Sequence, residues 1–479
     1  MTSSPGESED DSVRSVSDTM SNRNIRVAVV GNVDAGKSTL IGTLTTTVLD
    51  DGRGKSRSFI TRLIHEIETG RTSSVSSHLL GFKSNGSTVA NEHEGSATTT
   101  ANCRIKQKTE HEIAQEADRV VTLMDLAGHE KYLKTTIRGV SMGMADYALI
   151  LVNSRQPPTH MTRHHLNLCC VFGIPTIVVL TKVDGCPSHA KRNTKLEMSN
   201  MLRSPEIGKR PYVVRNERDV DTVKDKLHTL APFVEVSSVT GEGLDVLRNL
   251  LFSLPKRRHH QKKIGRPFEF LVENIFNVPG VGPVVSGFVN AGKLDIGDIV
   301  YIGPLDDGSF VKTTAKSAHV ARINVSHITA GQDATIALSL NKEQRQILRN
   351  GMVVVAKDEA TSTVTFEAEI CIMRGEGATI RENYCTMVHI LNIKQAARIV
   401  AIEVIHAGSN STMTSVATFD GAGIENEDET ILRAGSIAKV HFQFQKRPEH
   451  VRKGMRMLFR DGQVRGVGVV TGTVHCLDK

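Results

Sequence analysis

The chain has no tryptophan, and aromatic residues make up only 4% of its 479 residues. No stretch interleaves aromatic with basic side chains, which argues against a surface on which nucleic-acid bases stack. The seven cysteines are odd in number and show no CxxC spacing. This pattern argues against both a disulfide framework and a zinc site, so we interpret most of them as buried thiols.

Long apolar runs are also missing. No stretch approaches the roughly 20 apolar residues of a membrane helix, so we expect no membrane span. Residues 1–24 have neither a basic n-region nor an apolar h-region, and their serine and acidic bias predicts a disordered tail rather than a secretory signal. With 39% hydrophobic and 23% charged residues, the composition is typical of a folded protein, which we expect in the cytoplasm.

Positive charge is in excess. The formal net charge is +7, which permits an anionic partner such as RNA without requiring one. The densest basic run is PKRRHHQKK, Pro255 to Lys263. It lies between two regions of different pattern, and both a phosphate contact and a solvated linker fit it.

The first half of the chain alternates short apolar runs with helix-compatible segments. Unbroken apolar runs are typical of strands covered on both faces, and the helical segments between them predict crossovers in a mostly parallel α/β sheet. We assign residues 25–258 to this domain and 259–264 to a basic linker. The candidate strands are Ile25–Val30, Arg119–Met124, Tyr147–Val152, Thr176–Leu180 and Pro232–Val236.

From residue 265 the pattern changes to short alternating segments between glycine-bearing turns, such as PVVSGFV and AKVHFQF. This is typical of β-barrels, and the length suits two of them. We expect all-β barrel domains at 265–360 and 361–479, with the boundary near KDEATSTV, Lys357 to Val364.

The stretch GNVDAGKS matches the phosphate-loop pattern GxxxxGK[ST], directly after a predicted strand and before a helix-compatible segment. Its backbone N–H groups and the following helix can cradle phosphate oxygens, with Lys37 on the β- and γ-phosphates and the Ser38 hydroxyl on Mg²⁺. The predicted nucleotide contacts in this stretch are Gly31, Asn32, Val33, Asp34, Ala35, Gly36, Lys37, Ser38 and Thr39.

A second polar segment, DLAGH, follows the strand that ends near Met124. Asp125 can hold Mg²⁺ through water, and the Gly128 amide can meet the γ-phosphate. The two segments are therefore expected to be the ends of neighbouring strands at one phosphate site. These two segments alone do not distinguish between an ATPase, a nucleotide kinase and a GTPase.

Two further segments favour guanine. In TKVD, the Asp184 carboxylate can accept two hydrogen bonds from the N1–H and N2–H₂ edge of guanine, which adenine lacks, and Lys182 lies along the ring. In SSVTG, the Ser238 backbone can meet guanine O6. The predicted guanine contacts are Thr181, Lys182, Asp184, Ser237, Ser238 and Val239.

These four segments, followed by two β-domains, resemble the translational GTPases of the elongation factor Tu and 1A superfamily. The chain looks most similar to the GTP-binding protein 1 and 2 subfamily, through HEIETGRTSSV, LLGF, DLAGHEKYLKTTIRG, TKVD in place of NKxD, and VPGVGPVVSG. The likeness runs from about residue 25 to the end.

The resemblance implies further roles. His129, directly after Gly128, would orient the hydrolytic water, and the first-switch Mg²⁺ ligand would be Ser74 or Thr72 within GRTSSV. Thr181 stands where relatives carry the asparagine that braces the phosphate loop. We expect guanine binding to survive through Asp184, with a lower affinity.

The resulting expectation is a Mg²⁺-dependent GTPase of the translation apparatus that hydrolyses GTP to GDP and phosphate and is stimulated by the ribosome. The resemblance implies aminoacyl-tRNA and the ribosome as partners, or the machinery of ribosome quality control and mRNA decay, for a monomer. The alternative is a GTP-gated binding module that acts off the ribosome and uses hydrolysis as a timer. A P-loop kinase or ATP-dependent transferase fits TKVD and DLAGH least well.

Overall fold

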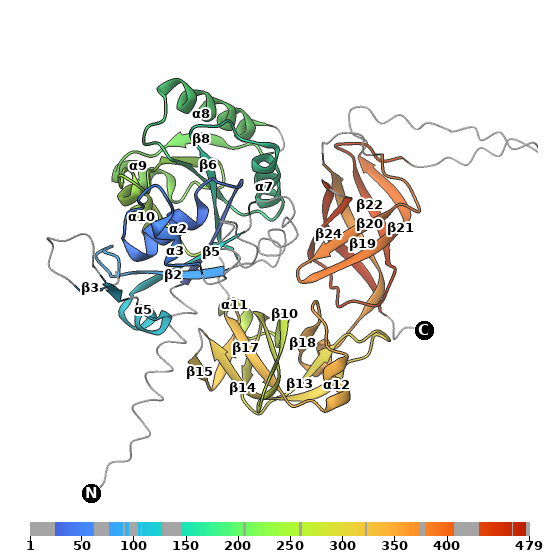
Figure 1. Cartoon of the computed structure of the whole chain (residues 1–479). Helices are drawn as coiled ribbons and strands as arrows, with labels where there is room; N and C mark the ends of the chain where they lie inside the picture. The colour runs from blue at the N-terminus through green and yellow to red at the C-terminus, as the bar shows by residue number, and fades with distance from the viewer. Residues whose placement is uncertain are drawn as a thin grey trace, which may run out of the picture. The chain divides into compact units, whose positions relative to one another are not determined.

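The computed structural model describes the chain in segments that form two compact units, residues 1–259 and 260–479, each considered by itself (Figure 1). The described residues are 24–61, 76–89, 92–94, 104–106, 108–126, 128, 145–204, 207–257, 261–320, 323–373, 379–406, 431–461 and 463–475. The predicted tail lies outside them, apart from its last residue. Among the described helices, none is both long and apolar enough to cross a membrane.

The first unit is built on a seven-stranded sheet. Neighbouring strands run parallel except β2 and β5, which are antiparallel, so the predicted mostly parallel α/β sheet is confirmed. In spatial order the strands are β2 (Ser76–Phe82), β5 (Arg119–Asp125), β1 (Asn24–Gly31), β6 (Tyr147–Asn153), β7 (Thr176–Thr181), β9 (Leu230–Glu235) and β8 (Arg210–Val213).

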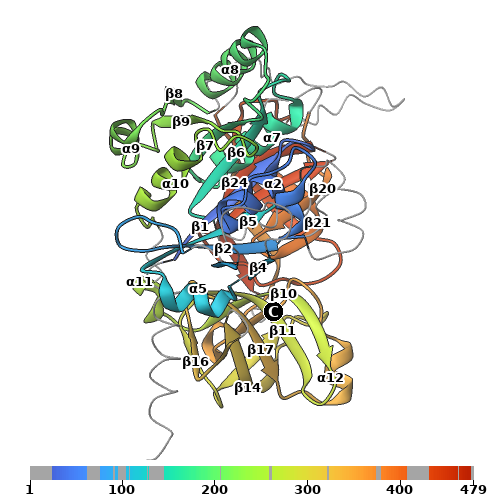
Figure 2. The same cartoon turned by 60° about the vertical axis from the view of Figure 1, so that its left-hand side comes forward.

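Helices cover both faces of this sheet, which is why its strands are apolar without alternation (Figure 2). Val27 and Val29 of β1 point to one face of the sheet and belong to the core cluster of buried residues on that face. Ala28 and Val30 point to the other face and are equally buried. The first face carries α2 (Lys37–Thr46), α9 (Glu217–Val223) and α10 (Leu244–Ser253), and the second α7 (His160–Val171) and α8 (Ser188–Arg203).

Smaller elements complete the unit. A four-residue helix α3 (Lys55–Ser58) packs on α2, and α5 (Glu110–Glu116) packs on β2. The strands β3 (Glu92–Glu94) and β4 (Arg104–Lys106) pair with each other.

The start of the basic run is bound to the sheet. The Arg119 guanidinium, at the first residue of β5, donates to the Leu254 carbonyl, and the Tyr147 hydroxyl, at the first residue of β6, donates to the Pro255 carbonyl at 2.5 Å. The predicted linker is also shorter than expected, because its Gln261–Ile264 part forms a helix, α11, which packs on the first barrel. Both differences arise from contacts that the charge pattern does not encode.

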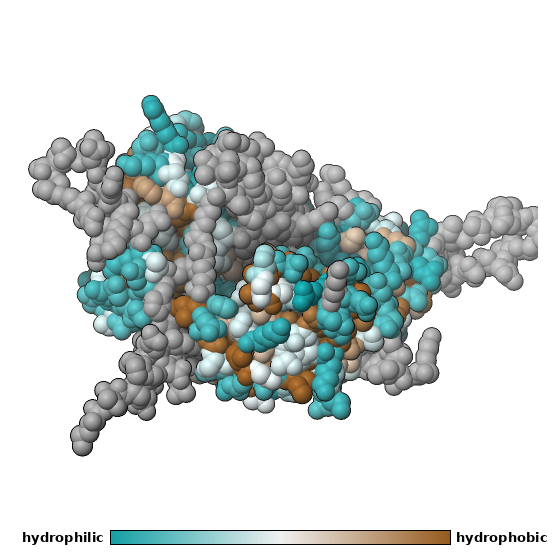
Figure 3. All heavy atoms as spheres, turned by 60° about the horizontal axis from the view of Figure 1, so that its bottom comes forward, coloured by the Kyte–Doolittle hydropathy of each residue, from teal (hydrophilic) through white to brown (hydrophobic). Residues whose placement is uncertain are grey.

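The second unit begins with an antiparallel sheet whose ring closes through the pairing of β13 with β14. Figure 3 shows hydrophobic residues scattered among polar ones on the visible face of the molecule. In spatial order the strands are β13 (Ile299–Gly303), β18 (Val353–Val355), β10 (Glu269–Val278), β11 (Gly282–Ala291), β17 (Asp333–Leu338), β14 (Val311–Val320) and β15 (Ile323–Val325), and β12 (Lys293–Asp295) pairs with β16 (His327–Thr329) beside them.

The second barrel has six strands in a closed antiparallel ring, which confirms the expectation of two all-β barrels. Its core is aromatic: the rings of Phe366 and Phe442 stack at 5.3 Å between centroids. In spatial order the strands are β19 (Thr363–Ile372), β22 (Ile437–Phe444), β21 (Ile393–His406), β20 (Cys385–Ile390), β23 (Arg456–Asp461) and β24 (Gln463–His475).

Buried charge joins the two barrels. Glu269 of β10 is 1% exposed and contacts Arg452, which lies just before β23, and the Asn290 amide donates to its carboxylate at 2.6 Å. Elsewhere in the unit, Arg349 and the buried Glu449 approach to 3.0 Å. These paired charges fix the two barrels against each other within the second unit.

Candidate nucleotide-binding site

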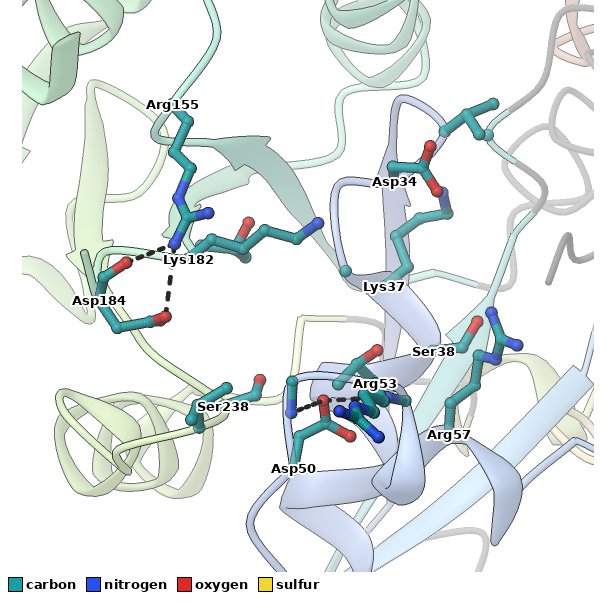
Figure 4. A pocket seen from close by; sticks show the side chains of 18 residues that line it. Asp34, Lys37, Ser38, Asp50, Arg53, Arg57, Arg155, Lys182, Asp184 and Ser238 are labelled. Atoms are coloured by element: carbon teal, nitrogen blue, oxygen red, sulfur yellow. Dashed lines mark hydrogen bonds and ion pairs between the residues drawn. The ribbon is translucent and has the colours of Figure 1, made fainter. Parts of the chain in front are cut away.

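The four polar segments of the first unit meet at the carboxyl ends of the central strands. They line one cavity of about 410 Å³ together with residues that no motif marks (Figure 4). In an open parallel sheet, such a crevice forms where the strand order reverses direction. β1 marks this point, because its neighbours β5 and β6 lie on opposite sides of it. The topology therefore places the predicted site where ligands of this fold class bind.

The loop from β1 to α2 is shaped by close backbone approach. A Cβ at Gly31 would lie 2.5 Å from the Leu151 carbonyl oxygen, and Gly36, which precedes α2, has φ of 82°. Both positions therefore need glycine. The loop turns its backbone around the point where α2 begins, as a phosphate cradle requires.

Lys37 folds back over this loop. Its Nζ donates to the carbonyl oxygens of Gly31 at 3.1 Å and Asn32 at 3.0 Å. Burial lowers the pKa of Lys37, while the nearby charges of Asp125 and Asp34 oppose that shift. A buried cation held by neutral carbonyls is well prepared to receive an anion.

Ser38 and Asp125 lie together at the start of α2 and the end of β5. The Ser38 hydroxyl donates to the Asp125 carboxylate at 2.6 Å, so the two predicted Mg²⁺ ligands are in direct contact. The described residues contain no group of three or more histidine, cysteine or acidic side chains suited to a metal ion. A hydroxyl and one carboxylate nevertheless fit Mg²⁺, which in nucleotide sites completes its shell with water and substrate phosphates.

Gly128 brings the second segment against the phosphate loop. A Cβ at this position would lie 2.5 Å from the Gly31 carbonyl oxygen and 2.3 Å from the Lys37 Nζ. Gly128, the predicted γ-phosphate contact, thus lies beside the loop lysine. The remaining predicted residues of the switches, His129, Ser74 and Thr72, lie outside the described residues.

Thr181, at the end of β7, is buried and braces the phosphate loop. Its hydroxyl donates to the Ala35 carbonyl oxygen at 2.8 Å. The threonine hydroxyl thus contacts the phosphate loop from the position at which the resemblance implies an asparagine brace. The lower guanine affinity expected from this difference stays a prediction.

The guanine end of the cavity is formed by TKVD and SSVTG. Lys182 has φ of 57°, a conformation that non-glycine residues rarely adopt outside functional sites. The Ser237 hydroxyl donates to the Asp184 carboxylate at 2.6 Å and also accepts hydrogen bonds from the backbone N–H groups of Val239 and Thr240, at 3.2 and 3.1 Å. One hydroxyl therefore orients the predicted base-reading carboxylate and shapes the neighbouring loop.

Sequence reasoning missed one wall of the cavity. Arg155 follows β6, donates to the Asp184 carbonyl at 2.7 Å and lies 3.6 Å from its carboxylate. A glycine-rich segment after α2 supplies the rest. Its turn composition was visible in the sequence, but nothing in the sequence showed that it faces the phosphate loop. The cavity-lining residues outside the motifs are Asp50, Gly52, Arg53, Gly54, Arg57 and Arg155.

The cavity is rich in positive charge, which suits a polyanionic ligand. Of its three lining carboxylates, Asp50 accepts backbone N–H groups and Asp184 accepts the Ser237 hydroxyl. The lining cationic side chains are those of Lys37, Arg53, Arg57, Arg155 and Lys182.

Residues 22–257 match the family described as "Elongation factor Tu GTP binding domain". GTP-binding protein 1 of Xenopus laevis is 36% identical over 452 residues, which cover 93% of this chain and 63% of that protein. GTP-binding protein 2 of Mus musculus is 36% identical over 466 residues, covering 96% of this chain and 71% of that protein.

A solved structure shares the fold of the whole chain. It is translation elongation factor SelB from Methanococcus maripaludis in complex with the GTP analogue GppNHp, with a TM-score of 0.62 and 19% identity over 95% of this chain and 80% of that one. Residues 22–257 thus form a GTP-binding domain of the elongation factor Tu type. The chain belongs to the family of GTP-binding proteins 1 and 2.

Proposed function

We propose that the chain binds GTP with Mg²⁺ in this cavity and hydrolyses it to GDP and phosphate. The observation that carries the proposal is the continuity of the cavity. It has the Lys37 and Ser38 cradle at one end and the Asp184 and Ser238 segment at the other, as a nucleotide with its base and phosphates requires (Figure 4).

Each predicted residue has a role in this proposal. The phosphate loop and Lys37 hold the β- and γ-phosphates, Asp184 selects guanine, and Thr181 keeps the loop in position. Ser38 and Asp125 would hold Mg²⁺, directly and through water, and the ion would neutralise charge on the phosphate oxygens. Catalysis by the chain itself is then positional and electrostatic.

Hydrolysis needs a water molecule in line with the γ-phosphate. We assign its orientation to His129, because Gly128, the preceding described residue, contacts the loop lysine. Ser74 or Thr72 would add the first-switch oxygen to Mg²⁺ in the GTP state. All three assignments rest on the resemblance, and that of His129 also on its position directly after Gly128.

We further propose that the chain acts in the cytoplasm as a monomeric translational GTPase, which hydrolyses GTP slowly alone and faster on the ribosome. The fold of the chain, with two barrels after the GTPase unit, matches that of a SelB elongation factor over 95% of the chain, and the net charge of +7 permits an anionic partner. Aminoacyl-tRNA is the substrate class that this assignment implies, in elongation or in ribosome quality control and mRNA turnover.

The test is GTP turnover by the purified protein, alone and with ribosomes whose A site is empty, for the wild type and for His129→Ala. We expect a large ribosome-dependent increase that His129→Ala abolishes while GTP affinity stays the same. Strong GTP binding with no ribosome effect would contradict the translational role. It would favour the GTP-gated module that acts off the ribosome.

A further inference from the structure

The segment from Asp50 to Arg57 is attached to the guanine side of the cavity. The Asp50 backbone N–H donates to the Ser238 carbonyl oxygen at 2.8 Å. The Asp50 carboxylate closes the segment on itself by accepting the backbone N–H groups of Gly52 at 3.0 Å and Ser56 at 2.9 Å. The segment therefore has a defined shape and a fixed connection to the loop that follows β9.

The other end of the segment packs on α2. A Cβ at Gly42 would lie only 2.2 Å from the Ser56 carbonyl oxygen, so the two backbones touch at a point that only glycine permits. Ser56 is fully buried, and its hydroxyl donates to the Val48 carbonyl at 3.0 Å. The segment is thus held beside the helix whose first residues, Ser38 and Thr39, line the cavity.

Two arginines of the segment, the exposed Arg53 and the half-buried Arg57, line the same cavity, whereas the exposed Lys55 between them is not part of the lining. In Figure 4, Arg57 extends beside Ser38, and Arg53 lies between Asp50 and Ser38. The two side chains therefore line the cavity near Ser38, one from α3 and one from the turn that precedes it. Lys37 and Gly128 approach each other elsewhere in the cavity, where we expect the γ-phosphate.

We propose that Arg53 and Arg57 bind the α- and β-phosphates of the guanine nucleotide. The backbone N–H groups of a phosphate loop cradle the α- and β-phosphates, and this loop leads directly into the first turn of α2, whose residues line the cavity with the two arginines. Guanidinium forms strong charge-assisted hydrogen bonds with phosphate oxygens. Because both phosphates remain after hydrolysis, the two arginines retain GDP as well as GTP. The inference rests on the nucleotide binding proposed above and is independent of the ribosome.

The test measures dissociation constants of GDP and GTP by competition with a fluorescent GDP analogue, without ribosomes. Arg53→Ala and Arg57→Ala are each expected to weaken both nucleotides about tenfold, which is the scale of one charge-assisted hydrogen bond. Lys55→Ala, which removes the same charge from the same segment outside the cavity, is the matched control and is expected to change affinity less than about twofold.

Three results would overturn the assignment: unchanged affinity in the double variant, an equal loss in Lys55→Ala, or a loss confined to GTP. Wild-type protein that binds neither nucleotide would overturn the nucleotide site itself, and this result is distinct from the other three. Thermal unfolding of the nucleotide-free variants identifies any loss of folding, and Arg57→Lys then supplies a folded variant that keeps the charge but lacks the forked geometry.

A second variant displaces the segment without removing charge. Gly42→Ala adds a methyl group against the Ser56 backbone and pushes α3 away from α2. We expect it to weaken GDP binding in the wild type and to have a smaller effect when both arginines are already alanine. Equal effects in the two backgrounds would show that the segment acts only through the fold.

Discussion

The Thr181 hydroxyl donates a hydrogen bond of 2.8 Å to the carbonyl oxygen of Ala35, and so joins the end of β7 to the phosphate loop. The threonine thereby contacts the loop from the position at which the resemblance implies an asparagine brace. The bond is buried, so its removal leaves an unsatisfied carbonyl in the loop.

We expect Thr181→Val, which keeps the shape and removes the hydroxyl, to increase the dissociation rate of GDP about fivefold, corresponding to about 1 kcal/mol for one hydrogen bond. Stopped-flow release of a fluorescent GDP analogue measures it. Thr181→Ser is the control and should release GDP at nearly the wild-type rate. Identical rates for valine and threonine would show that the brace does not act on bound nucleotide.

Gly128→Ala tests the approach of the second segment to the phosphate loop. Its methyl group would lie 2.5 Å from the Gly31 carbonyl oxygen, so the backbone at Gly128 must withdraw. We expect single-turnover GTP hydrolysis to fall by about tenfold or more, because the γ-phosphate contact is displaced. Gly265→Ala is the control, since a Cβ there has no neighbour within 4 Å. Unchanged hydrolysis in Gly128→Ala would place the γ-phosphate contact elsewhere.

Base selection can be separated from phosphate binding at Asp184. Asp184→Asn replaces an acceptor with a donor opposite the guanine N1–H, while xanthine offers a carbonyl oxygen where guanine has its amino group. We expect GTP affinity to fall by about 100-fold and xanthosine triphosphate to become the preferred ligand. Competition binding with both nucleotides measures the ratio. Retained GTP preference would contradict the role of this carboxylate.

The buried Glu269 makes the stability of the second unit depend on pH. Burial disfavours its charged form, but the His450 ring, the Arg452 guanidinium and the Asn290 amide outweigh burial and lower the pKa of Glu269 to about 2. Because the pKa of Glu269 is lower in the folded than in the unfolded state, the ionised carboxylate stabilises the second unit in full above the unfolded pKa of 4.5. This stabilisation is lost as the pH falls from 4.5 towards 2. The contribution is on the order of 3 kcal/mol.

Urea unfolding of the wild type and of Glu269→Gln at pH 7 and pH 3 measures this contribution. The glutamine variant should be less stable at pH 7, and the difference should shrink at pH 3. Glu369→Gln, at an exposed position of β19, should show no such change. A difference between wild type and Glu269→Gln that does not depend on pH would mean that Glu269 acts through packing alone.

The sequence predicted five strands of the first sheet and the motifs that line the two ends of the cavity, because both depend on local patterns, but it did not predict β2 and β8. Unbroken apolar runs marked strands buried on both faces, and the glycines of GNVDAGKS marked a loop whose geometry other residues cannot adopt. Arg53 and Arg57 could not be predicted. Their position depends on contact between Gly42 and Ser56, a tertiary approach that leaves no periodic signal. The brace by Thr181 likewise depends on the distance between two chain segments.

The bonds at Arg119 and Tyr147 determine where a force from the C-terminal side enters the GTPase unit. Both residues begin strands, and β5 ends six residues later at Asp125, the predicted Mg²⁺ ligand. A pull on Leu254 or Pro255 is therefore borne by the β5 and β6 strands themselves and not by α10 alone. The sheet that carries the chemistry is in this way also the mechanical anchor of the chain that follows it.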